Sequence, residues 1–125
     1  NGKNNLKVSL IIANVELDKG SILLKRDLKF EGTELYDEIR EKQAKITKSI
    51  IYEFIKNYPE ILDNKIKQMG VGTFNKKLTL KDNELNIHQS INKQFNKLRI
   101  GNNEGWPSYF YKKGIKYIIK IYKDK

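Results

Sequence analysis

Polar and hydrophobic residues alternate along the first thirty positions of the chain, and the hydrophobic ones are rich in β-branched types. This pattern is typical of strands that have one buried face. Two such runs, LKVSLIIANVEL and ILLKRDLKF, are separated by Asp-Lys-Gly-Ser, a combination that favours a tight turn. We therefore predict a small antiparallel β-meander over residues 1–31.

The hydrophobic period lengthens to three or four residues from Thr33 onward, which predicts helices over residues 33–70. The first helix either continues to residue 57 or divides at Thr47, which is a suitable N-cap. Pro59 ends it, and a second, shorter helix with the sequence EILDNKIKQM follows. The apolar stripe of the first helix consists of Leu35, Ile39, Ile46, Ile50 and Phe54.

A third helix is predicted over residues 83–100, and a β-hairpin over residues 106–123. The helix has an apolar stripe with His88 at its edge as a packing residue, and the hairpin joins the runs SYFY and IKYIIKIY through Lys-Lys-Gly. Strands, three or four helices and a C-terminal hairpin together indicate the α+β class. We predict one winged helix-turn-helix domain over residues 1–125, in which the third helix enters the major groove of DNA.

The face of the third helix opposite its apolar stripe is rich in amide and basic side chains. Asn and Gln amides carry a donor and an acceptor together and suit the edge of adenine, while Lys can donate to guanine or to phosphate. The residues expected to read bases are Asn86, Gln89, Ser90, Lys93, Asn96 and Lys97. Contacts to the DNA backbone are expected from Arg99, Lys112, Lys113 and Lys116.

The formal net charge of +10 is unevenly distributed along the chain. Residues 1–41 have a net charge of −1, whereas residues 42–125 have a net charge of +11. A basic half favours a polyanionic partner, because neutralised phosphates release counterions, and we expect that partner to be double-stranded DNA. Lys, Asn and Ile account for 52 of the 125 residues, so an AT-rich genome also explains the raw charge, although it explains the asymmetry less well.

The order of these elements resembles the winged-helix effector domain of response regulators of the OmpR/PhoB type. The segments that show the resemblance are VELDKGSILLKRDLKF, ITKSIIYEFIKNYPEIL, NIHQSINKQFNKLRI for the recognition helix and FYKKGIKYIIKI for the wing. The resemblance implies the DNA-binding domain of a transcriptional regulator. A winged helix of another lineage, such as a plasmid or phage replication initiator, is an alternative.

Two other classes of function compete with DNA binding. A protein-interaction module would use the helix at 33–57 as its contact surface, and a homodimer through that helix is compatible with DNA binding as well. A metal-dependent nuclease would use Asp18 together with Asp27 and Lys29, a layout that is common by chance. The chain has one histidine, no cysteine and no Walker-type phosphate loop, so we expect neither an enzyme nor a cofactor or metal site.

No apolar run is long enough to span a membrane, so we expect no membrane association and a cytoplasmic location. The chain starts with NGKNN and has no initiator methionine, which indicates a fragment of a longer protein. A sensor or receiver domain is therefore compatible with the sequence on the N-terminal side.

Overall fold

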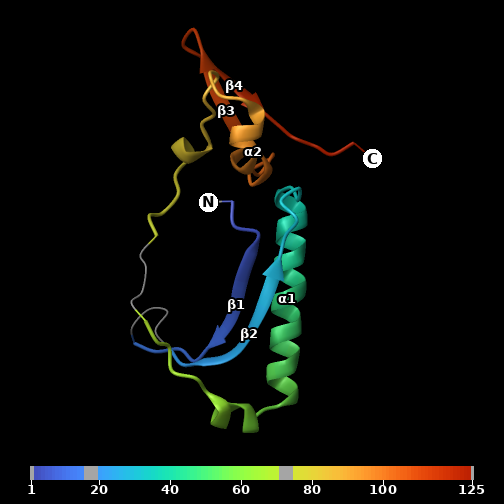
Figure 1. Cartoon of the computed structure of the whole chain (residues 1–125), viewed down its shortest axis with the longest axis vertical. Coiled ribbons are helices and arrows are strands. Elements are labelled where there is room, and N and C mark those ends of the chain that lie inside the picture. The colour runs from blue at the N-terminus through green and yellow to red at the C-terminus, as the bar shows by residue number, and fades with distance from the viewer. Residues whose placement is uncertain (1, 16–19, 71–74, 125) are drawn as a thin grey trace. The chain divides into compact units, whose positions relative to one another are not determined.

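The first two strands form an antiparallel hairpin in the computed structural model, which describes residues 2–15, 20–70 and 75–124 (Figure 1). The chain divides into two units by its internal contacts. We call residues 3–29 and 41–74 the N-terminal unit, and residues 1–2, 30–40 and 75–125 the C-terminal unit. Each is described by itself.

In the N-terminal unit, strand β1 (Asn5–Ile11) pairs with strand β2 (Ile22–Lys29), with an irregular register between Leu10 and Ile11. Helix α1 (Tyr36–Lys56) continues into this unit and lies beside β2 (Figure 1), where Arg26 of β2 forms an ion pair with Glu53 of α1. The buried hydrophobic residues of the unit are Ile22, Leu28, Ile50 and Ile61.

The helices predicted over residues 33–70 differ from the observed ones. Helix α1 is unbroken and starts at Tyr36, so Thr47 is not a second N-cap. The predicted second helix is only the 3₁₀ turn η1 (Glu60–Asn64). It stops there because Ile66 exchanges two backbone hydrogen bonds of 2.8 Å with Ile22, so strand-type pairing takes the backbone groups that a longer helix would need.

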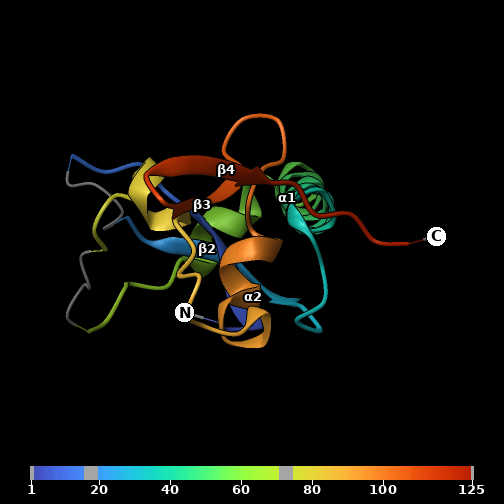
Figure 2. The same ribbon diagram turned by 90° about the horizontal axis from the view of Figure 1, so that it is seen from above.

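In the C-terminal unit, the 3₁₀ turn η2 (Leu80–Asn83) precedes helix α2 (Ile91–Arg99), which packs beside the antiparallel hairpin of strands β3 (Ser108–Lys112) and β4 (Ile115–Ile119), as Figures 1 and 2 show. The hairpin lies inside the range predicted from the sequence. Its turn places Lys113 at φ 51° and Gly114 at φ 78°, the two positive values that a tight hairpin turn requires.

The helix predicted over residues 83–100 is much shorter than expected, because local side-chain hydrogen bonds compete with helix formation before residue 91. The Asn86 side-chain oxygen accepts the His88 backbone N–H at 2.9 Å, which holds a turn. The Ser90 hydroxyl then accepts the Lys93 N–H at 3.3 Å and caps α2.

The winged-helix prediction is therefore wrong. The described residues form two α-helices and two separate two-stranded sheets, rather than a three-helix helix-turn-helix followed by a wing. Element order along the chain is similar in both folds, and only the pairing partners distinguish them.

Candidate functional site

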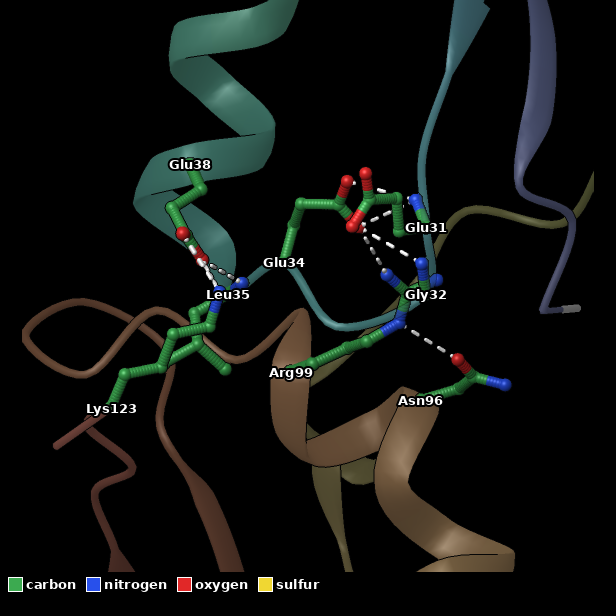
Figure 3. Close-up of polar contacts among 8 residues, drawn as sticks. All are labelled: Glu31, Gly32, Glu34, Leu35, Glu38, Asn96, Arg99 and Lys123. Atoms are coloured by element: carbon green, nitrogen blue, oxygen red, sulfur yellow. Dashed lines mark hydrogen bonds and ion pairs between the residues drawn. The ribbon is translucent and has the colours of Figure 1, made fainter.

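A buried ion pair joins the loop before α1 to the end of α2 in the C-terminal unit (Figure 3). The Arg99 Nη1 atom lies 3.6 Å from Glu34 Oε2, and the two side chains are only 5% and 6% exposed. The Glu34 carboxylate also accepts the backbone N–H groups of Glu31, at 2.9 and 3.1 Å, and of Gly32, at 3.0 Å. The Arg99 Nε donates to Asn96 Oδ1 at 2.8 Å. These interactions hold a buried carboxylate and a buried guanidinium in place, as such groups require.

A second ionic contact lies at the start of α1. Glu38 accepts the backbone N–H of Leu35 at 2.8 Å and pairs with Lys123 at 2.7 Å (Figure 3). The hydrogen bond from Lys123, followed by that from Leu35, holds the pKa of the Glu38 carboxyl below its usual value. This contact ties the C-terminal segment to the first turn of the helix.

The side chain of Gln94 is buried and fixes the segment that precedes α2. Its Oε1 accepts the Asn86 N–H at 2.6 Å, while its Nε2 donates to the carbonyl of Asn86 at 3.0 Å and to that of Gln89 at 3.2 Å. Leu85 is also anchored, because its N–H donates to the Tyr109 carbonyl of β3 at 2.7 Å. The segment from residue 84 to residue 89 is therefore attached to both α2 and β3.

An open groove of about 520 Å³ lies between this segment, α2 and β3. Cationic, amide, imidazole and phenol groups meet there, so the groove can bind an anionic ligand that also has a flat ring. Its lining consists of Lys81, Glu84, Leu85, Asn86, Ile87, His88, Lys97 and Tyr111.

The predicted DNA-contacting residues do not form one surface. Asn86 and Lys97 line the groove, whereas Asn96 and Arg99 belong to the buried ion pair. Ser90 serves as the cap of α2, and the backbone of Gln89 is bound by Gln94. The remaining predicted residues are exposed lysines, with no carboxylate partner among the residues that the structure describes: Lys93, Lys112, Lys113 and Lys116.

Sequence reasoning missed Glu34, Lys81 and Tyr111, because no local pattern connects residues that lie so far apart in the chain. His88 was expected to pack against the core, but it is exposed and lines the groove, since α2 starts after it. In the nuclease hypothesis, Asp18 lies outside the described residues. Asp27 pairs with Lys7 at 2.6 Å, and the described part of the chain has no cluster of three or more metal-binding side chains.

Comparisons with known proteins give one consistent name. No model of a known protein family matches the sequence. A methionyl-tRNA formyltransferase from Rickettsia massiliae is 31% identical over 120 residues, which are 96% of this chain and 38% of that protein. The chain thus spans less than two fifths of the curated relative.

Two solved structures share the fold. A methionyl-tRNA formyltransferase from Clostridium thermocellum superposes with a TM-score of 0.72 and 20% identity, over 99% of this chain and 53% of the other. A 4-N formyltransferase from Francisella tularensis superposes with a TM-score of 0.68 and 21% identity, over 94% and 50%. The chain therefore has the fold of a part of these formyltransferases.

These similarities overturn the functional predictions made from the sequence. The resemblance to response-regulator effector domains is wrong, and so are sequence-specific binding of double-stranded DNA, the replication-initiator and interaction-module alternatives, the nuclease and the expectation of no enzyme. The helix at 33–57 is no longer supported as a dimer surface of a DNA-binding protein. Among the described residues, no helix is long and apolar enough to cross a membrane.

Proposed function

We propose that the chain is part of a formyltransferase whose acceptor is the amino group of methionyl-tRNA. The observation that supports this most directly is the similarity of 96% of the chain to a protein with that name. The fold supports the same proposal independently of sequence identity. A cytoplasmic location belongs to this proposal, because charged tRNA is a substrate of translation.

Formyl transfer makes an amide from an amine. The amine nitrogen forms a bond to the formyl carbon, the bond between that carbon and its donor breaks, and the amine loses one proton. The acceptor must therefore be bound with its amino group next to the donor, and much of the rate enhancement comes from that positioning. We assign the described residues to acceptor binding rather than to the chemical step.

The charge of the C-terminal segment supports an RNA acceptor. Residues 75–125 contain twelve Lys or Arg residues and four Asp or Glu residues. Two of the lysines are paired with carboxylates, Lys120 with Glu104 and Lys123 with Glu38, while those of the hairpin turn are exposed. Exposed lysines attract a polyanion at long range and bind its phosphates.

A small molecule with a 4-amino group is the second candidate acceptor, because one structure with the same fold is a 4-N formyltransferase. The two acceptors differ in charge and size, so one assay separates them. The full-length protein that contains this chain is incubated with a small-molecule fraction of bacterial extract as the source of formyl groups. The acceptors are methionine-charged tRNA, tRNA charged with another amino acid, and a panel of small 4-amino compounds.

Mass spectrometry of the amino acid released from tRNA gives the result. We expect formylmethionine from the methionine-charged tRNA and little formylation of the other charged tRNA. Formylation of a 4-amino compound alone would replace the tRNA acceptor with the second candidate. Absence of formyl transfer to any acceptor, while a known formyltransferase works in the same extract, would overturn the proposal.

A further inference from the structure

We propose that the groove lined by Lys81, Lys97 and Tyr111 is a nucleotide-binding site, which takes one base and its phosphate. The nucleotide is either a unit of single-stranded RNA or a free nucleoside diphosphate, and the two share the chemistry that the groove recognises. The RNA form rests on the proposed function and names the part of the tRNA that binds there, namely an unpaired nucleotide. The site itself is independent of the formyl acceptor.

Two lysines provide the phosphate contact. Lys81 comes from η2 and Lys97 from α2, so the cations approach from different elements of the groove. The Lys97 ammonium is held by a hydrogen bond of 3.0 Å to the Glu84 carbonyl, which leaves its other two N–H groups for a ligand. Neither lysine forms an ion pair with a carboxylate within the described ranges.

The one carboxylate in the groove belongs to Glu84, and it has another partner. Glu84 interacts with the Tyr109 hydroxyl, and burial together with this carboxylate raises the pKa of that phenol. The negative charge of Glu84 is therefore directed toward β3. Its presence reduces the positive potential of the groove, which fits a ligand with one or two phosphates better than it fits a dense polyanion.

Tyr111 provides a ring for stacking. Its side chain is 47% exposed, and its ring meets that of Tyr109 edge to face, with the centroids 5.9 Å apart and an interplanar angle of 88°. Tyr109 is itself buried and has the Lys116 ammonium 3.9 Å from its ring centroid. The orientation of Tyr111 is therefore set by a fixed neighbour, while the rest of its ring is free to receive a base.

The wall opposite Tyr111 is rigid. Gln94 binds three backbone groups of residues 86 and 89, and Leu85 is joined to Tyr109, so the Asn86 and His88 side chains are carried by an ordered backbone. An ordered wall reduces the entropy that binding would otherwise cost. The groove volume of about 520 Å³ also lies in the range of small-ligand sites.

The geometry selects an unpaired base. A base inside a duplex is stacked on both faces and cannot present a face to Tyr111, whereas a base in a single strand can. Duplex nucleic acid would therefore bind only through phosphate contacts that do not depend on the ring. This difference separates the proposed site from general attraction to a basic surface.

The test uses the full-length protein that contains this chain, with two probes. One is a short fluorescein-labelled single-stranded RNA followed by anisotropy, and the other is ADP followed by calorimetry; the matching RNA duplex is the comparison. We expect Tyr111→Ala to weaken binding of at least one single-nucleotide or single-strand probe about tenfold, which corresponds to about 1.4 kcal/mol. Tyr111→Phe keeps the ring and should bind like the wild type, and Tyr111→Leu keeps the bulk without the aromatic face and should bind like Tyr111→Ala.

Lys97→Ala tests the phosphate contact. With single-stranded RNA, the slope of log affinity against log salt should fall by about 0.7, because one phosphate contact is lost. The matched controls are Tyr52→Ala and Lys48→Ala, two exposed residues of α1 in the other unit, and both should leave affinity unchanged.

The outcomes separate this site from the proposed function. If Tyr111→Ala and Tyr111→Leu leave the affinity for both probes unchanged, the site is wrong, even where methionyl-tRNA is formylated. Equal losses for duplex and single strand would also overturn it, because the ring would then not contact a base. If methionyl-tRNA is not formylated but ADP binding depends on Tyr111, the nucleotide site stands and the proposed acceptor is wrong.

Discussion

The guanidinium of Arg99 and the carboxylate of Glu34 are 3.6 Å apart and almost completely buried, although 65 positions separate them in the sequence. The pair connects the loop at the start of α1 to the end of α2 and so determines the local structure of the C-terminal unit. A buried charge that loses its partner keeps its desolvation cost without compensation.

We expect Arg99→Met to lower the free energy of unfolding by about 3–5 kcal/mol, because it leaves the Glu34 carboxylate without its cation. The double variant Glu34→Gln with Arg99→Met should be less destabilised than the sum of the two single variants. Urea denaturation monitored by circular dichroism measures each value. Lys7→Met, which breaks an exposed ion pair with Asp27, is the control and should change stability by about 0–1 kcal/mol. Additive single effects at Glu34 and Arg99 would show that the two groups are not coupled.

Gln94→Ala should destabilise the protein by about 1–3 kcal/mol, because the buried backbone groups of residues 86 and 89 lose their hydrogen-bond partner. Hydrogen exchange should at the same time become faster at the amide of Asn86. Asn92→Ala changes an exposed residue of the same helix and serves as the control. An unchanged exchange rate at Asn86 would contradict the role assigned to Gln94.

The contact between Glu38 and Lys123 predicts a dependence of stability on pH. The folded-state pKa of Glu38 lies below its ordinary value of 4.5, so the stabilisation is present above pH 4.5 and is lost as the pH falls through the folded-state pKa. Glu38→Gln should therefore lower stability at neutral pH and flatten its decrease in acid. Lys123→Met should have a similar effect, and the double variant should differ little from either, as thermal unfolding at several pH values would show. A full acid dependence in Glu38→Gln would assign the effect to other carboxyls.

The turn between β3 and β4 offers a test in both directions. Lys113 has a left-handed backbone conformation that costs an L-residue about 1–2 kcal/mol, and Asn tolerates it better, so Lys113→Asn should stabilise the hairpin. Gly114→Ala should destabilise it by about 1–2 kcal/mol through backbone strain alone, because no atom lies within 4 Å of the added Cβ. Lys112→Asn, at the end of a strand, is the control for the lost charge. Urea midpoints of the three variants provide the comparison, and equal effects of Lys112→Asn and Lys113→Asn would exclude the backbone explanation.

Several elements could be predicted from the sequence because they depend on neighbouring residues. The alternating pattern indicated the strands of β1 and β2, the apolar repeat indicated α1, and Lys-Lys-Gly indicated the turn of the last hairpin. The asymmetry of charge was also a property of the sequence alone. None of these signals identifies a fold, because many folds arrange strands, helices and a hairpin in a similar order along the chain.

The tertiary structure decided which residues meet. Arg99 has the sequence character of a surface cation, yet Glu34 supplies the partner that allows it to be buried. Gln94 and Asn86, which appear from the helical period to share one helix, lie on two different segments that bind each other. Lys81, Lys97 and Tyr111 form one groove only because η2, α2 and β3 pack together. Hydrogen bonds and ion pairs between distant residues have no period along the chain, so the candidate site became visible only in three dimensions.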